Sequence, residues 1–67
     1  MIYSILLDKN KYTKHDVMNF VQMNQIEPMR ILLDDLNYKI IINNISKQDK
    51  KQLKMMEILG CMKLKYL

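Results

Sequence analysis

The side chains that could carry acid–base or metal chemistry are few and scattered along this chain. Asp8 ends an apolar run, Asp34–Asp35 form an adjacent pair, and His15 is the single histidine. If the first and third strands run parallel, Asp8 comes near Asn43 and Asn44, and a metal-dependent nuclease-like enzyme centred on Asp8 is one hypothesis. Glu27 could lie at the same edge, but no histidine or second aspartate joins Asp8 to complete such a site. A residue that starts a loop is the more typical role of an aspartate in this position.

Cysteine and histidine offer no better route to catalysis. Cys61 is the only cysteine, so the chain cannot form an internal disulfide. One cysteine and one histidine are also too few for a zinc site. We therefore predict no catalytic residue, no cofactor and no metal, and a protein that is not an enzyme. A single cysteine is typical of a reducing compartment, which favours a cytoplasmic location.

Lysine is the charged residue that stands out. The chain has 11 Lys+Arg against 7 Asp+Glu, a net charge of +4, which favours an acidic partner, either nucleic acid or protein. Part of this charge recurs at helical spacing and predicts a basic stripe on a second helix. Such a stripe could contact phosphates together with two lysines of the last strand, although it is more often a solvated helix face. The candidate nucleic-acid or acidic-partner residues are Lys47, Lys50, Lys51 and Lys54, with Lys63 and Lys65.

Apolar periodicity and capping signals predict the elements that must position these residues. Thr13 with Asp16, and Ser46 with Asp49, are both typical of a helix N-terminus. Gly60 suits a helix stop. The predicted strands cover residues 2–7, 29–33, 38–42 and 61–67, and the predicted helices cover 14–25 and 47–59. Pro28 favours an edge position for the second strand.

The resulting order of elements, βαββαβ, resembles the ferredoxin-like fold. The resemblance concerns architecture alone. It implies a single α+β domain over residues 1–67, with a four-stranded antiparallel sheet in the order 4-1-3-2 and two helices on one face. The other face of the sheet is then left open.

Alternation along the strands predicts which side chains occupy that open face. Lysines of the last two strands cannot lie in the core, so their neighbours Tyr38, Ile40, Met62 and Leu64 should face the helices. The outward set forms an apolar strip with a basic rim, which resembles a protein interface. Our candidate partner-binding residues are Ile2, Leu6, Arg30, Leu32, Lys39, Ile41, Lys63 and Lys65.

These patterns favour a small, non-enzymatic binding protein that docks through its open sheet face onto a protein or a second copy of itself. The alternatives are a nucleic-acid-binding protein and the nuclease-like enzyme described above. A composition rich in isoleucine, lysine and asparagine favours a phage or mobile-element accessory protein that modulates or inhibits a host complex. The apolar run of residues 2–7 is too short for a signal peptide or a membrane span, so we expect no membrane association. Because the sequence has no catalytic or cofactor motif, we also expect no small-molecule substrate.

Overall fold

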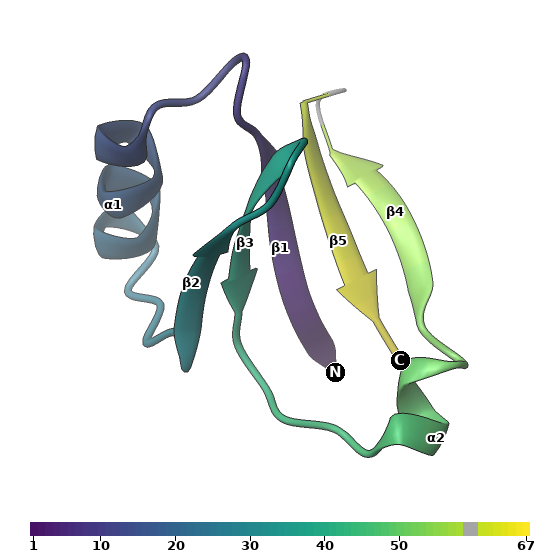
Figure 1. The fold of residues 1–67 in the computed structure, drawn as a ribbon. Helices are drawn as coiled ribbons and strands as arrows, with labels where there is room; N and C mark the ends of the chain where they lie inside the picture. Colours follow the sequence, from purple (N-terminus) through teal and green to yellow (C-terminus); the bar gives the residue numbers. More distant parts are fainter. Residues whose placement is uncertain (59–60) are drawn as a thin grey trace.

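The computed structural model describes residues 1–58 and 61–67, which form an antiparallel sheet with two helices (Figure 1). Strand β1 is central and α1 lies to one side of the sheet. The short α2 lies at the end of the sheet where the two chain termini also meet. The elements are β1 (Ile2–Asp8), α1 (Lys14–Met23), β2 (Arg30–Leu33), β3 (Asn37–Ile41), α2 (Lys47–Lys50), β4 (Lys54–Ile58) and β5 (Met62–Tyr66).

The sheet has five strands in the order β2-β3-β1-β5-β4, and every neighbouring pair is antiparallel. The predicted α+β class is therefore correct, but the predicted four-stranded ferredoxin-like sheet in the order 4-1-3-2 is wrong. Strands β1 and β3 are antiparallel, which pairs Asp8 with Asn37. The expected approach of Asp8 to Asn43 and Asn44 does not occur, because Asn43 lies at the opposite end of β1 and donates to the Ile2 carbonyl.

The error arises in the segment predicted as a second long helix. Ser46 does start a helix, and its hydroxyl accepts a hydrogen bond from the Asp49 amide at 3.1 Å. This helix ends at Lys50, however, and the following residues form β4. Pairing places Met56 opposite Leu64 and Ile58 opposite Met62. The predicted helix end at residues 59–60 lies outside the described residues.

Helix α1 is confirmed, with both ends defined by local hydrogen bonds. Thr13 and Asp16 form a reciprocal capping box: each side chain accepts from the other residue's amide, at 3.2 and 2.8 Å. At the C-terminal end, the Ile26 amide donates to the Val21 carbonyl and Gln25 adopts φ 53°. This left-handed residue ends the helix in the way that a glycine usually does.

The core lies between α1 and the face of the sheet that α1 covers. Val17 and Val21 from the helix pack on Ile5, Leu7 and Ile40, in one cluster with Met62. The prediction that Tyr38, Ile40, Met62 and Leu64 face the helical side is confirmed, since all four belong to this cluster or pack against it. Among the described residues, neither helix combines the length and the apolar character needed to cross a membrane.

Candidate docking surface

The opposite face of the sheet carries most of the residues predicted to bind a partner. Cross-strand pairing arranges this face in two central rows, each running across all five strands. The first row is Arg30, Ile41, Ser4, Lys65 and Met55, and the second is Leu32, Lys39, Leu6, Lys63 and Glu57. We call these ten positions the lysine face. They hold four cationic side chains and one carboxylate.

The apolar centre of the lysine face is buried although no helix within residues 1–58 and 61–67 packs on it. Leu6 is flanked in its row by Lys39 and Lys63, and it is only 5% exposed although α1 packs on the other side of the sheet. Ile41 is also buried. The three lysines of the face are half-buried. This is the pattern expected when lysine methylenes lie along apolar surface while the ammonium groups stay in water.

This arrangement corrects the expected apolar strip. Leu6 and Ile41 are buried, so they offer little exposed surface to a partner. Ile2 lies outside the two rows and is 40% exposed; the register shifts between Ile2 and Ser4, and Ile2 pairs with Tyr66. Leu32 and Met55 instead supply the exposed apolar surface, one on each edge strand, at 43% and 54% exposure. The sequence analysis missed Met55 because it placed this residue in a helix.

A polar atom without a partner lies under the lysine face. Ser4 is fully buried between Ile41 and Lys65, and its hydroxyl makes no hydrogen bond to any of the described residues. Burying a hydroxyl in this way usually costs about 1–3 kcal/mol. The centre of the sheet therefore contains a buried hydroxyl without a hydrogen bond, whereas the core on the helical side is aliphatic.

The residues predicted as a basic helix stripe do not form one. Lys47 and Lys50 lie on α2 and Lys51 follows it, but Lys54 begins β4 opposite Tyr66. Tyr66 is on the helical side of the sheet, so Lys54 points away from Lys63 and Lys65. Lys50 places its ammonium 5.7 Å from the centre of the Tyr3 ring, a cation–π distance.

The positions considered for catalysis have structural roles. The Asp8 carboxylate accepts from the Asn10 amide at 2.8 Å, which fixes the start of the loop that leads to α1. Asp34 accepts from the amides of Leu36 and Asn37 in the β2–β3 turn, and these hydrogen bonds lower the pKa of its carboxyl. Within residues 1–58 and 61–67, no group of three or more His, Cys, Asp or Glu side chains could hold a metal ion.

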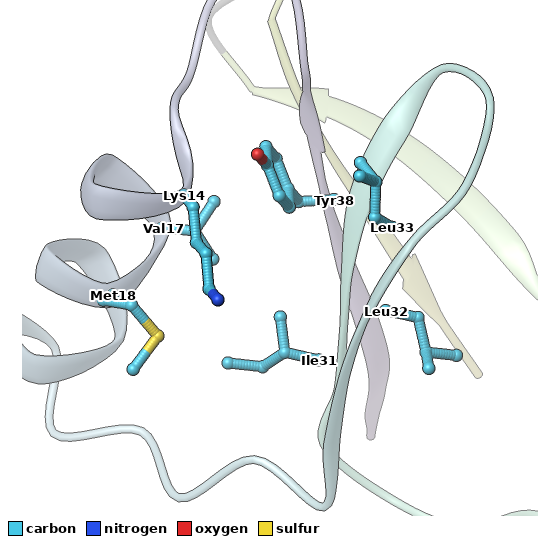
Figure 2. A pocket seen from close by; sticks show the side chains of 7 residues that line it. All are labelled: Lys14, Val17, Met18, Ile31, Leu32, Leu33 and Tyr38. Atoms are coloured by element: carbon cyan, nitrogen blue, oxygen red, sulfur yellow. The ribbon is translucent and has the colours of Figure 1, made fainter.

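A second surface feature was not predicted from the sequence. A groove of about 310 Å³ separates α1 from β2 (Figure 2). We call it the α1–β2 groove. Ile31 and Tyr38 point toward the helix, whereas Leu32 points to the other side of the strand, and the Lys14 ammonium extends into the gap. The lining residues are Lys14, Val17, Met18, Ile31, Leu32, Leu33 and Tyr38.

Comparison with known proteins adds nothing to this description: no family model, no curated protein and no solved structure matches the chain.

Proposed function

We propose that this protein is a non-enzymatic binding protein that docks onto an acidic protein surface through its lysine face. The observation that carries the proposal is the charge of that face. The ten positions lie on the side of the sheet away from α1, and Glu57 is the one acidic residue among them. Four are basic: Arg30, Lys39, Lys63 and Lys65. Electrostatic complementarity of this kind speeds encounter and selects the partner.

The apolar contribution comes from the edges of the same face. Leu32 and Met55 are exposed on the two edge strands, and the lysines of the face lie between them on β3 and β5. Interfaces usually combine such apolar contacts with charged groups whose stems can be desolvated. In this role the protein would act by occupying a surface of its target. That is how a phage or mobile-element accessory protein would modulate or inhibit a host complex.

A pull-down from the native host tests this proposal with a matched pair of variants. Lys39→Glu plus Lys63→Glu reverses two charges at the centre of the lysine face. Lys9→Glu plus Lys11→Glu makes the same change in the exposed loop before α1. We expect proteins captured by the wild type to be lost with the first variant and retained with the second. Equal capture by both variants would refute docking through this face.

A binding assay with a labelled duplex separates a protein partner from a nucleic acid. A nucleic-acid binder loses affinity steeply with salt and binds duplexes of unrelated sequence. We expect a labelled DNA or RNA duplex to show no such salt-dependent binding. Salt-dependent binding that is lost with Lys47→Glu plus Lys51→Glu would reject our proposal in favour of nucleic acid.

A further inference from the structure

We infer that the outer edge of β2 is a pairing site for β2 of a second copy of this chain, which would join two sheets into one. The inference is independent of the proposed function. It rests on three features of β2: backbone groups that point away from the sheet, apolar side chains that remain exposed, and opposite charges at the two ends of the strand.

The register of the β2–β3 hairpin identifies the free backbone groups. The Asp34 amide donates to the Asn37 carbonyl at 2.9 Å, so this pair is hydrogen-bonded. Antiparallel pairs alternate, so Leu32 with Lys39 is also a hydrogen-bonded pair. The amides and carbonyls of Ile31 and Leu33 therefore point outward from the edge of the sheet. An edge strand with such groups free is a template for another strand.

The side chains along this edge are unusually apolar for a free edge strand. Leu33 is 61% exposed, and Leu32 and Met29 are also exposed. Natural edge strands are commonly protected by charges, a proline or a covering element. Here Pro28 precedes the strand, and Arg30 is the only charged residue within Arg30–Leu33. Beside the strand, the α1–β2 groove leaves room for an added side chain (Figure 2).

A two-fold axis through Leu32 makes this edge complementary to itself. Antiparallel pairing about that axis sets Ile31 opposite Leu33 of the second copy, and each such pair exchanges both of its backbone hydrogen bonds. The same register sets Arg30 opposite Asp34 of the second copy, twice. Leu32 meets its own equivalent on the lysine face. Every contact in this arrangement is apolar with apolar, or cation with anion, as an isologous interface requires.

We assign a second copy as the occupant because this register matches Arg30, at the start of β2, with Asp34, directly after its end, and matches the apolar residues between them. One consequence is a change in the α1–β2 groove. Leu33 of the second copy would lie beside Ile31 at the mouth of the groove, and its exposed side chain would be buried. The two lysine faces would become one continuous surface.

Solution mass, measured over a dilution series by light scattering, tests the inference directly. We expect the wild type to approach twice the 8.1 kDa chain mass as its concentration rises. Leu33→Pro removes an outward amide without removing a β2–β3 hydrogen bond, and it should return the mass to that of one chain. Met23→Ser is the control: Met23 is the last residue of α1, its side chain is 83% exposed, and this variant should leave dimerisation unchanged. A wild type that stays monomeric throughout, or a folded Leu33→Pro variant that still dimerises, would overturn the inference.

A charge-exchange experiment tests the register itself. Homodimers of the Arg30→Glu variant would bring two carboxylates together at each end of the paired strands. Homodimers of the Asp34→Lys variant would bring two cations together at the same places, so each variant alone should be monomeric. Their mixture should form a heterodimer, because both cross-strand pairs are then opposite in charge. A mixture that stays monomeric while circular dichroism shows both variants folded would rule out this register.

Discussion

The chain contains two serine hydroxyls in opposite situations, and the same substitution should change stability in opposite directions. Ser4 is fully buried, and its hydroxyl makes no hydrogen bond to any of the described residues. Ser46 is exposed, and its hydroxyl accepts from the Asp49 amide at the start of α2. Alanine removes the hydroxyl in both cases. We expect Ser4→Ala to stabilise the fold and Ser46→Ala to destabilise it.

The magnitudes follow from what each hydroxyl does. An unpaired buried hydroxyl costs about 1–3 kcal/mol, and removing it leaves a small void and a residue less suited to strands, so the net gain for Ser4→Ala should be about 1 kcal/mol. Loss of an N-cap costs about 0.5–2 kcal/mol. Because α2 has four residues, we expect the lower end of that range for Ser46→Ala. In a domain of this size, 1 kcal/mol moves the Tm by roughly 4–8 °C.

Urea unfolding followed by circular dichroism at one fixed protein concentration measures both changes, and thermal unfolding checks them. Fixing the concentration keeps any self-association constant between variants. Ser4→Thr is the companion variant: it keeps the hydroxyl, so it should not show the gain. The reasoning fails if Ser4→Ala destabilises the protein, since the hydroxyl must then have a partner that stabilises it.

Three further predictions concern the core, a helix end and the response to acid. Ile40→Ala should cost about 2–5 kcal/mol because Ile40 is fully buried, whereas Leu36→Ala, at 70% exposure, should change urea stability by less than about 0.5 kcal/mol. Gln25→Gly should stabilise the protein by about 1 kcal/mol because Gln25 adopts φ 53°, and an equal or lower Tm would contradict this. Backbone hydrogen bonds lower the pKa values of the Asp16 and Asp34 carboxyls below 3.8, so stability present above pH 3.8 should be lost as the pH falls through the folded-state values. Asp16→Asn plus Asp34→Asn should flatten that acid limb in a series of urea titrations.

Local signals in the sequence predicted the first half of the fold and its last strand well. The Thr13–Asp16 pair located the start of α1, and Pro28 indicated that β2 is an edge strand. Alternation of lysine with apolar residues placed Met62 and Leu64 on the helical side. Each of these features depends on neighbours close in sequence, or on the rule that charged groups stay out of the core.

The segment that forms β4 was not predictable by the same means. Residues 51–58 are rich in lysine, glutamine, leucine, methionine and glutamate, which all favour helix, and Ser46 supplies a real helix start. Pairing of Met56 and Ile58 with β5 overrides that preference. The signal available was the short spacing between Ile58 and Met62, which suits a hairpin as well as it suits a helix stop.

The residues of the candidate surface were mostly predicted, but the exposure of its apolar side chains was overestimated. Arg30, Leu32 and the three lysines lie on one face as expected, because alternation alone decides this. The burial of Leu6 was not predicted, because alternation gives the face of a side chain and not how much of it its neighbours cover. The register shift between Ile2 and Ser4 likewise has no sequence signal that we can identify.

The central place of β1 has a consequence for how the chain reaches its folded state. Strand β1 precedes both of its neighbours, β3 and β5, by long stretches of sequence, since Ile5 pairs with Ile40 and Leu64. Contacts so distant in sequence slow folding, since loops must close before they form. The apolar β1 therefore lacks one of its two neighbouring strands until β5 has been synthesised. Aggregation of nascent chains should accordingly begin at this strand.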